Sequence, residues 1–331
     1  MKITFFETKP EDQTILQSLL PDLDLNFTPD ILSKETTTQA VDSEVISVFV
    51  GSKVDRPVID ALPKLKAILT RSTGFDHIDS EYARQKGIVV CNVAGYGATC
   101  VAEFTFGLIL SLSRKIVQAN RKLRETDEFS FEHLQGFDLH GKILGIIGTG
   151  RIGQNVARLA VAFGMKILAF DVHPNDELAK FCQYVSLDSL LQQSDVITVH
   201  VPYGPTTHHL LNQDKLKLIK PGTVMVNTSR GEIIETEALM EALNDGRLAG
   251  AGLDVLEGEH ELKEELQLLA DPISSVADFK KLYEGHHLIH LPQVVVTPHM
   301  AFYSKEAIAE ILQTTAENLK KFLTGKPQNV V

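Results

Sequence analysis

Three polar residues of this chain have the types needed to move a proton beside a bound carboxylate. Arg230, Glu259 and His299 each stand just beyond the end of a separate apolar stretch. A guanidinium can bind a carboxylate bidentately, an imidazole can exchange a proton near neutral pH, and a second carboxylate can orient the imidazole and stabilise its charged form. Alone, each is commonly an ordinary surface or core residue. Their joint placement indicates a catalytic set.

A glycine-rich segment, Gly148-Thr149-Gly150-Arg151-Ile152-Gly153, follows the apolar run Ile143–Ile147 and opens the predicted helix Gly153–Phe163. A G-x-G-x-x-G string alone is a weak signal, but here a strand precedes it and a helix follows it. In that context the first glycine makes a tight turn, the second lets backbone approach a pyrophosphate, and the third allows close packing. The segment therefore predicts a dinucleotide site at a helix N-terminus.

An acidic residue follows the next apolar run. Asp171 directly follows Lys166–Phe170 and lies 18 residues beyond Gly153. A carboxylate at this position is expected to accept hydrogen bonds from both hydroxyls of an adenosine ribose and to repel a 2′-phosphate. The alternative is a tight turn followed by an ordinary acid at a strand end. With the loop, helix, strand and acid in register, the sequence predicts NAD as cofactor in preference to NADP.

The elements that must position these residues alternate between short apolar runs and helical patterns, which favours an α/β architecture. The first series contains the predicted strands Ile3–Phe6, Val45–Val50, Ala67–Thr70 and Ile88–Val90, with helices at Gln13–Leu20 and Arg56–Leu62. The second contains six buried strands: Ile143–Ile147, Lys166–Phe170, Val196–Val199, Val224–Asn227, Ala251–Asp254 and Val294–Thr297, with intervening stretches that include Asp188–Gln193 and Glu235–Asp245. Six such strands with crossover helices are typical of a doubly wound dinucleotide fold.

Two longer helices decide the domain organisation. Val101–Lys115 is predicted to be a buried helix that joins the two series, and Ser304–Leu323 follows the last strand and is expected to return to the N-terminal unit. We therefore predict two Rossmann-like, doubly wound parallel-sheet domains. One is discontinuous and comprises residues 1–100 and 300–331, and the other is a dinucleotide-binding domain of residues 101–299.

Composition excludes several classes of function. The 331 residues carry a formal net charge of −11, which argues against a nucleic-acid binder or a polybasic membrane ligand. No apolar run reaches the length of a membrane span, and the N-terminus does not read as a secretory signal. Three cysteines without a CxxC pair indicate free thiols, no metal site and a cytoplasmic protein. The doublets His208-His209 and His286-His287 are interpreted as surface residues, because adjacent side chains point in different directions.

The motifs together make the chain resemble the D-isomer-specific 2-hydroxyacid dehydrogenase family over nearly its whole length, and most closely the D-lactate dehydrogenase branch. The similar segments are Arg71–Asp79, Gly148–Gly153, His200–Pro202, Asn227–Glu232, Gly252–Glu259 and Thr297–Tyr303. The resemblance implies reversible hydride transfer between NADH and a 2-oxoacid, with His299 as acid–base, Glu259 as its partner and Arg230 on the substrate carboxylate. Glu257 is the acid most easily confused with Glu259.

The resemblance also implies which residues bind the ligands. The first domain would hold the substrate. The expected substrate contacts are Thr73, Gly74, Tyr96, Arg230, His299 and Phe302. The expected cofactor contacts are Gly148, Gly150, Arg151, Ile152, Gly153, Asp171, His200, Val201, Pro202, Thr207, Thr228, Ser229, Arg230, Asp254 and His299. A homodimer packed through the cofactor domains, with Val101–Lys115 near the interface, is expected as well.

Alternatives stay open within and outside the family. A hydroxypyruvate, glyoxylate or phosphoglycerate type of reductase shares the motifs, although the long segment between Glu259 and His299 and the aromatic residues Tyr96, Phe302 and Tyr303 favour the lactate-like branch. Formate dehydrogenases are similar but carry Gln where this chain has Glu259. An NAD-sensing, non-enzymatic corepressor-like protein is the rival of another class. Gly51 stands where related lactate enzymes have Tyr, which predicts room for substrates larger than pyruvate.

Overall fold

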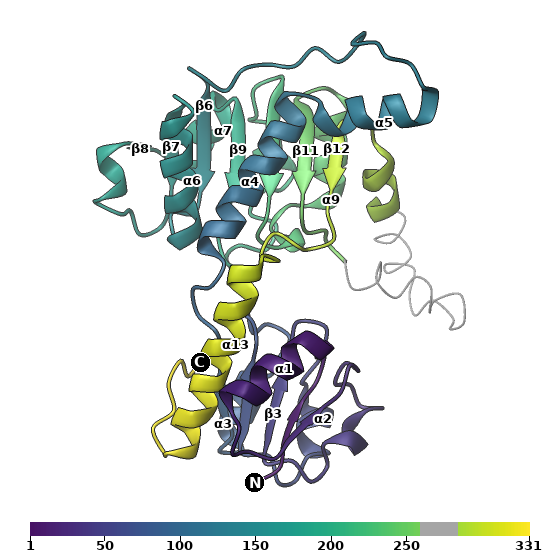
Figure 1. Cartoon of the computed structure of the whole chain (residues 1–331). Helices are drawn as coiled ribbons and strands as arrows, with labels where there is room; N and C mark the ends of the chain where they lie inside the picture. Colours follow the sequence, from purple (N-terminus) through teal and green to yellow (C-terminus); the bar gives the residue numbers. More distant parts are fainter. Residues whose placement is uncertain (259–283) are drawn as a thin grey trace. The chain divides into compact units, whose positions relative to one another are not determined.

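The structure is a computed structural model, and it describes residues 1–258 and 284–331. Its chain divides into two compact units (Figure 1). Unit 1 comprises Met1–Gly97 and Tyr303–Val331, so it is built from both ends of the chain, and unit 2 comprises Ala98–Phe302. Each unit has its own parallel sheet.

Unit 1 contains a five-stranded sheet in the order β2-β1-β3-β4-β5. Its strands are β1 (Ile3–Phe5), β2 (Leu25–Phe27), β3 (Val45–Val48), β4 (Ala67–Thr70) and β5 (Val89–Cys91). All four pairings are parallel. Because β1 lies between β2 and β3, the strand order reverses there, and the loops that follow β1 and β3 diverge. In open parallel sheets such a reversal is where ligands bind, outside the carboxyl ends of the strands.

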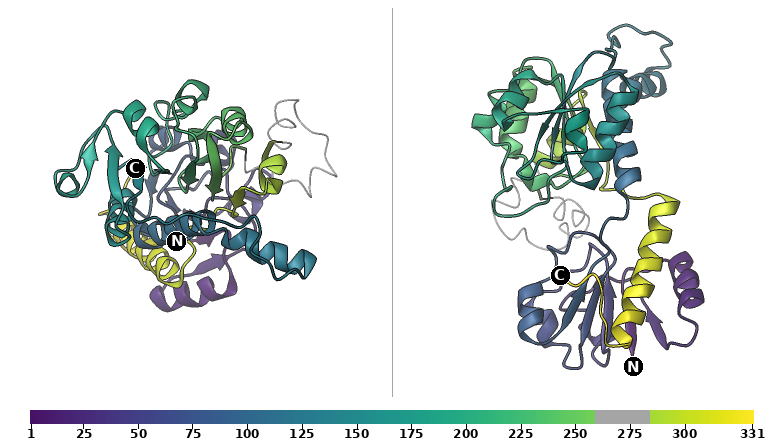
Figure 2. Two further views of the ribbon diagram at one scale, coloured as in Figure 1. Left: turned by 90° about the horizontal axis from the view of Figure 1, so that it is seen from above. Right: turned by 90° about the vertical axis from the view of Figure 1, so that its left-hand side faces the viewer.

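Helices cover both faces of the unit 1 sheet (Figure 2). They are α1 (Pro10–Leu19), α2 (Arg56–Asp60), α3 (Ser80–Gln85) and α13 (Lys305–Leu323), with a short 3-10 helix at Thr37–Gln39. Leu16 of α1 and Leu312 of α13 pack in one cluster with Phe5, while Ile59 of α2 packs with Ile46 on the opposite face. Burial on both faces explains why these strands are continuously apolar in sequence.

Unit 2 contains a seven-stranded parallel sheet in the order β12-β11-β10-β9-β6-β7-β8. The strands are β6 (Ile143–Ile147), β7 (Lys166–Phe170), β8 (Gln183–Tyr184), β9 (Val196–Val199), β10 (Thr223–Asn227), β11 (Leu248–Leu253) and β12 (Val294–Val296). β6 pairs with both β7 and β9, so the order reverses between β6 and β9. This arrangement is the doubly wound dinucleotide-binding topology with one added strand.

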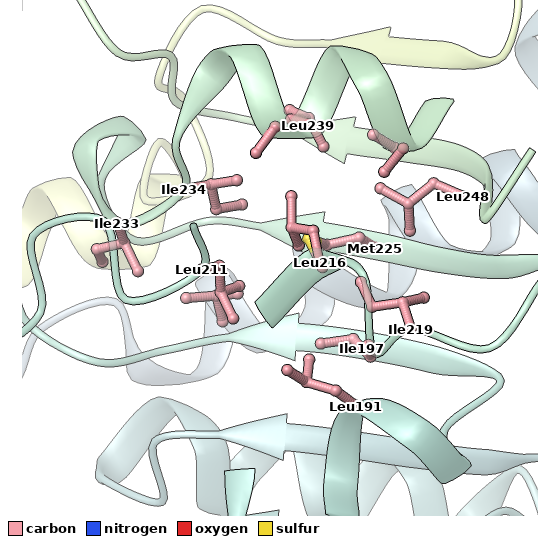
Figure 3. Packing of buried hydrophobic residues seen from close by; sticks show 14 of the residues in the cluster. Leu191, Ile197, Leu211, Leu216, Ile219, Met225, Ile233, Ile234, Leu239 and Leu248 are labelled. Atoms are coloured by element: carbon pink, nitrogen blue, oxygen red, sulfur yellow. The ribbon is translucent and has the colours of Figure 1, made fainter. Parts of the chain in front are cut away.

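The unit 2 sheet is likewise covered on two faces. Its helices are α4 (Ala98–Ser113), α5 (Ile116–Thr126), α6 (Arg151–Ala162), α7 (Leu187–Gln193), α8 (Gln213–Leu216) and α9 (Thr236–Asn244), with 3-10 helices at Leu178–Lys180 and Gly231–Ile233 and helical residues at 284–290. α4 and α6 pack on one face in a single apolar cluster. On the other face, Leu191, Leu216 and Leu239, from α7, α8 and α9, pack over strand residues Ile197 and Met225 (Figure 3).

The predicted fold class, two doubly wound parallel-sheet domains, is confirmed. Two strands were missed: β2 and β8 have three and two residues and lie at sheet edges, where partly exposed side chains weaken the apolar signal. The prediction of a helix at Val101–Lys115 was wrong at both ends, since α4 begins at Ala98 and ends at Ser113. Lys115 has left-handed backbone (φ 57°), and a separate helix, α5, begins after it.

Candidate functional site

The carboxyl edge of the unit 2 sheet gathers most of the predicted site residues. Because every strand of that sheet is parallel, the loops that follow the strands leave it at one edge. Along this edge, from β12 to β7, lie in order His299, Asp254, Thr228–Arg230, His200–Pro202, Gly148–Gly153 and Asp171. The reversal between β6 and β9 falls between the glycine loop and His200.

The glycine loop connects β6 directly to α6, as the sequence predicts. Gly148 has left-handed backbone (φ 95°), and a Cβ there would lie 2.7 Å from the carbonyl carbon of His200. A Cβ on Gly153 would overlap the carbonyl oxygen of Gly148. Gly150, in contrast, is the N-cap of α6 without a side-chain cap, and a Cβ there would meet no atom of the described residues within 4 Å. The loop therefore leaves open space before the N-terminus of α6, which suits a pyrophosphate.

Asp171, which follows β7, binds the glycine loop through hydrogen bonds from Thr149. Its Oδ2 accepts hydrogen bonds from the Thr149 N–H (2.6 Å) and the Thr149 hydroxyl (2.9 Å), and its Oδ1 accepts from the His173 N–H (2.9 Å). Burial alone would raise the pKa of Asp171, but these hydrogen bonds outweigh it and hold the pKa below the usual value. The carboxylate is thus ionised at neutral pH, and it retains acceptor capacity for the hydroxyls of a ribose.

A second contact to Thr149 was missed by the sequence reasoning. The Tyr184 hydroxyl of β8 donates to Thr149 Oγ1 (3.0 Å) and itself accepts the Asn175 N–H (2.9 Å). Nothing in the local pattern marks this edge-strand tyrosine as part of the loop. Its role depends on the pairing of β8 with β7.

His200 passes over the glycine loop at the end of β9. Its N–H donates to the Ile147 carbonyl (2.7 Å), while both ring nitrogens are buried without a hydrogen-bond partner among the described residues. Burial lowers the pKa of His200 to about 3, so the ring is neutral. The next residues are tied down, since Ser229 Oγ donates to the Val201 carbonyl and Thr207 Oγ1 donates to the Pro202 carbonyl (2.7 Å). The imidazole keeps hydrogen-bonding capacity for a bound group.

Arg230 lies in a turn held by Asn227, the last residue of β10. The Asn227 side chain donates to the Arg230 carbonyl (2.8 Å) and accepts the Ser229 N–H (3.0 Å), and the Arg230 side chain is half-buried. Gly231 is required because a Cβ there would overlap the backbone of Leu256 and Glu257. The Arg230 turn therefore packs directly against the loop that follows β11. On its other side, the Thr228 hydroxyl lies 3.1 Å from that of Thr105 in α4.

His299 lies in a left-handed turn (φ 51°) after β12, and Asp254 at the end of β11 organises that turn. Asp254 is 1% exposed and accepts hydrogen bonds from the Thr297 hydroxyl (2.5 Å) and from the N–H groups of Met300 (2.9 Å) and Ala301 (2.8 Å). Burial raises the pKa of Asp254, although these hydrogen bonds and the nearby His299 oppose the shift. Both carboxylate oxygens of this predicted cofactor contact are thus engaged by the chain itself, which the sequence did not reveal.

Glu259 lies outside the described residues, whereas Glu257 is described. Glu257 Oε2 accepts a hydrogen bond from the Thr236 hydroxyl (2.9 Å), and Oε1 lies 3.2 Å from His209 Nε2. The interpretation of His209 as a plain surface residue was wrong, because its side chain is 32% exposed and paired with this acid. The His208 and His209 rings stack 4.0 Å apart, with left-handed backbone at His209 (φ 48°). Glu257 therefore anchors the loop after β11.

In unit 1, the predicted substrate-carboxylate loop follows β4. Thr73 Oγ1 donates to the Val93 carbonyl (2.9 Å), Asn92 donates to the Thr73 carbonyl (2.8 Å), and Ser72 Oγ donates to the Gly74 carbonyl (2.6 Å). The N–H groups of Thr73 and Gly74 donate to no residue in the described part of the chain. These two donors are therefore fixed in place and available to an anion.

The two aromatic residues among the predicted substrate contacts, Tyr96 and Phe302, belong to different units. Tyr96 of unit 1 stands between Gly95 (φ 89°) and Gly97 (φ 73°) and is half-buried. Phe302 is the last residue of unit 2, and its carbonyl accepts a hydrogen bond from Cys100 Sγ (3.4 Å). The predicted substrate residues are thus divided between the two units.

The expectation that Gly51 leaves open space is wrong at the Cβ position, whereas the expected acceptance of substrates larger than pyruvate stays a prediction. A Cβ on Gly51 would lie 2.5 Å from Oε1 of Glu7 and 3.3 Å from a methyl carbon of Ile31. The Glu7 carboxylate therefore occupies the space beside position 51. Sequence reasoning could not find this contact, because Glu7 and Gly51 lie on different strand ends and meet only through the pairing of β1 with β3.

Within residues 1–258 and 284–331, no three His, Cys, Asp or Glu side chains converge in a way that could hold a metal ion. None of the helices in the same part of the chain combines the length and apolar character that crossing a membrane requires.

Comparisons with known proteins agree with this geometry. Residues 106–301 match the family described as "D-isomer specific 2-hydroxyacid dehydrogenase, NAD binding domain". The chain is 38% identical to "2-hydroxyacid dehydrogenase homolog 1" of Schizosaccharomyces pombe, covering 97% of this chain and 96% of that protein. It is 35% identical to the D-lactate dehydrogenase of Escherichia coli, covering 98% of each chain.

A solved structure is similar as well. The D-lactate dehydrogenase of Aquifex aeolicus, determined in complex with NAD and lactic acid, superposes with a TM-score of 0.88 at 36% identity, covering 98% of this chain and 96% of that one. The fold and the residues along the carboxyl edge of the unit 2 sheet define the class of this protein, which is a doubly wound α/β protein with a dinucleotide site. The chain belongs to the D-isomer specific 2-hydroxyacid dehydrogenase family. It is an oxidoreductase whose cofactor is NAD.

Proposed function

We propose that this protein reversibly reduces a small 2-oxoacid to the D-2-hydroxyacid with NADH, as a dehydrogenase of the D-lactate type. The observation that carries the proposal is the shared sheet edge of unit 2, where the glycine loop, Arg230 and His299 follow strands of one parallel sheet. In this proposal residues 101–299 bind the cofactor, and residues 1–100 with 300–331 supply the rest of the substrate site.

Residues of the unit 2 edge would hold the cofactor. The open space at Gly150, before the N-terminus of α6, supports pyrophosphate binding, and the ionised Asp171 supports recognition of the ribose hydroxyls. When bound, NADH supplies the hydride. The neutral, buried His200 would border the cofactor, because the backbone of His200 and Val201 lies over Gly148 of the glycine loop. The carbonyl groups of Val201 and Pro202 are held by Ser229 and Thr207, which supports a fixed position for this segment beside the cofactor.

The substrate carboxylate would be held by a cation and by backbone donors. Arg230 offers a planar guanidinium, which suits a carboxylate because it can donate two parallel hydrogen bonds. The N–H groups of Thr73 and Gly74 offer further donors. In this arrangement the negative charge of the substrate is neutralised, and its carbonyl carbon is left for hydride attack.

His299 would move the proton. In reduction, the protonated imidazole donates to the carbonyl oxygen as the carbon accepts the hydride, and the neutral imidazole remains. In oxidation, the neutral imidazole accepts the hydroxyl proton as the carbon loses its hydride. Glu259 would orient the ring and stabilise its protonated form. The hydrogen bonds of Glu257 to Thr236 and His209 support Glu259, and not Glu257, in this role.

Assembly and location complete the proposal. A homodimer is supported by the chain that follows α4, where Ile116 is 54%, Phe129 96% and Phe131 90% exposed in the single chain. A second copy covering this region would remove these apolar side chains from water. A cytoplasmic location is supported by the cysteines Cys91, Cys100 and Cys182, which are all free thiols.

The test is a panel of 2-oxoacids with NADH, read as loss of NADH absorbance and followed by chiral analysis of the product. We expect reduction of pyruvate or a near homologue to the D-hydroxyacid. Binding of NADH without turnover of any 2-oxoacid would contradict the proposal and favour a sensing role.

A further inference from the structure

The strand-order reversal of the unit 1 sheet is bridged by one side chain. Glu7 follows β1, and the segment 49–52 (Phe49, Gly51 and Ser52 among its residues) follows β3, so the two flank the reversal. The Glu7 carboxylate accepts hydrogen bonds from the Phe49 N–H (2.8 Å), the Gly51 N–H (2.8 Å) and the Ser52 hydroxyl (2.5 Å). All three partners are donors, which matches a carboxylate, because an ionised carboxylate only accepts.

The backbone of Glu7 is held in an unusual conformation to make this bridge. Its φ of 52° lies in the left-handed region, which residues other than glycine rarely adopt. Such a conformation persists where the surrounding structure fixes it, and it is common at ligand sites. Here the Arg71 guanidinium fixes it by donating to the carbonyls of Phe6 (2.5 Å) and Glu7 (3.0 Å).

Arg71 connects the same bridge to the predicted substrate-carboxylate loop, whose first residue it is. It is 3% exposed, donates to the Ser47 hydroxyl (3.0 Å), and its guanidinium carbon lies 5.9 Å from the centre of the Phe49 ring. Burial lowers the pKa of Arg71 to about 10, against the opposing effect of the Glu7 charge, so the side chain stays cationic at neutral pH. Glu7 and Arg71 therefore fix both the 49–52 segment and the start of the loop that contains Thr73 and Gly74.

Glycine at position 51 is the complement of Glu7. A Cβ at this position would approach Glu7 Oε1 to 2.5 Å, well inside normal contact, while the backbone there does not need glycine for conformational reasons. Position 51 thus carries no side chain of its own, and the carboxylate of Glu7, which follows β1, lies in the space that such a side chain would take.

We propose that Glu7 is a specificity-determining positioning residue for the 2-oxoacid side chain. It fixes the 49–52 segment as the wall of the crevice at the carboxyl edge of unit 1, so that the Phe49 position and the backbone of that segment, rather than a side chain at position 51, limit substrate size. This inference rests on the proposed function, which puts the substrate at that edge.

The experiment compares kcat/KM for pyruvate and for the branched 2-oxoacid 4-methyl-2-oxopentanoate in the wild type and in Glu7→Ala, Glu7→Gln and Gly51→Ala. Glu11→Gln is the matched control, because Glu11 is an exposed glutamate in α1 of the same unit. In Glu7→Ala three donors lose their acceptor and the segment can relax. We expect the ratio of the two kcat/KM values to change by about tenfold in favour of the branched substrate, the scale of one methylene group in an apolar pocket.

Two readouts separate positioning from a merely structural role. The KM for NADH should stay at the wild-type value, since the cofactor residues belong to unit 2. Gly51→Ala should change the substrate ratio in the wild-type background but have little effect in the Glu7→Ala background, where the clash with Oε1 is gone. If Glu7→Ala does not fold, Glu7→Gln and Gly51→Ala test the same contact, because each disturbs it without emptying the site.

The outcomes are distinguishable. A lower melting temperature with an unchanged substrate ratio in all Glu7 and Gly51 variants would overturn this inference and leave the proposed function intact. A wild type that reduces no 2-oxoacid would overturn the proposed function and this inference with it.

Discussion

The main-chain N–H of His299 donates to the carbonyl oxygen of Asp254 at 2.8 Å, so the proposed acid–base residue, which follows β12, is bound to the end of the neighbouring strand β11. The Asp254 carboxylate adds bonds to both flanks of the same turn, at Thr297 and at Met300 and Ala301. A left-handed non-glycine residue costs on the order of 1–3 kcal/mol, and these bonds offset it. Asp254 thereby sets where the imidazole lies.

Asp254→Asn should therefore reduce turnover while leaving the fold intact. The amide keeps the shape of the carboxylate, but its NH₂ group would face a donor from Thr297, Met300 or Ala301, and the His299 turn would shift. A displacement of about 1 Å at a catalytic group can cost about 100-fold in rate, so we expect a fall in kcat of roughly 10- to 100-fold. The measurement is steady-state kcat in the reductive direction.

Asp214→Asn is a suitable control for this variant, because the Asp214 side chain is 91% exposed. It should keep the wild-type kcat. If Asp254→Asn also turned over at the wild-type rate, the carboxylate would not be needed to position His299.

Arg230→Lys should show that the shape of the cation matters as well as its charge. Lysine keeps the positive charge but loses the planar pair of donors, so kcat/KM for the 2-oxoacid should fall by an amount equivalent to about 2–4 kcal/mol. Binding of NADH, followed by stopped-flow fluorescence, should be nearly unchanged, because the glycine loop is not altered. A lysine variant with near-normal kcat/KM would mean that another group binds the substrate carboxylate.

Asp171 should control the choice of cofactor. Because its ionised carboxylate repels a 2′-phosphate, we expect the wild type to prefer NADH over NADPH by at least about tenfold in kcat/KM. Asp171→Ser should shrink this ratio. It should also loosen the glycine loop, because two hydrogen bonds to Thr149 are lost.

Thr149→Val separates these two effects of Asp171. It removes the hydrogen bond from the Thr149 hydroxyl to Asp171 but leaves the charge of the Asp171 carboxylate. KM for both cofactors should therefore rise, while the ratio of kcat/KM for NADH to kcat/KM for NADPH is kept. A ratio that fell equally in Thr149→Val and Asp171→Ser would assign cofactor choice to loop geometry and not to charge.

Much of this arrangement could be predicted from the sequence. Both parallel sheets and the glycine loop follow from continuous apolar runs and from local turn chemistry, which are properties of neighbouring residues. The contacts that set the site are different in kind. These contacts join residues from different strands or strand ends, so only the pairing of the strands reveals them. They are the contacts of Asp254 with Ala301, Tyr184 with Thr149, and Glu7 with Gly51.

His200 should make the protein sensitive to mild acid. The folded ring has a pKa lowered to about 3, whereas the unfolded ring has its ordinary value of 6.5. At pH 7.5 neither state is protonated and the group has no effect. Below the ordinary pKa the unfolded state takes up a proton that the folded state does not, so the free energy of unfolding falls by about 1.4 kcal/mol per pH unit at most, down to the folded pKa.

The measurement is the urea midpoint of the wild type and His200→Asn at pH 7.5 and at pH 5.5. The urea midpoint of the wild type should fall relative to that of His200→Asn as the pH falls, because asparagine does not titrate. Parallel behaviour at both pH values would show that His200 is protonated in the folded protein.

The proton transfer itself should depend on Glu259 and not on Glu257. In the proposed mechanism reduction needs protonated His299, so kcat/KM for reduction should fall as the pH rises, whereas kcat/KM for oxidation should rise over the same range. Glu259→Gln keeps the side-chain shape but removes the charge that we propose stabilises the imidazolium, so the reductive limb should move to lower pH by on the order of one unit or more.

Glu257→Gln is the matched control, because it removes the same charge two positions earlier in the sequence, at a residue whose carboxylate already accepts a hydrogen bond from Thr236 and is paired with His209. We expect Glu257→Gln to lower the melting temperature and to leave the pH profile in place. His299→Gln should lose roughly 10²–10⁴-fold in turnover with NADH binding kept, which calibrates the size of the proton-transfer effect. The deciding measurement is kcat/KM for reduction against pH in the wild type and the two glutamine variants. Superimposable profiles for the wild type and Glu259→Gln would remove Glu259 from the relay, and a shifted profile in Glu257→Gln alone would put Glu257 in its place.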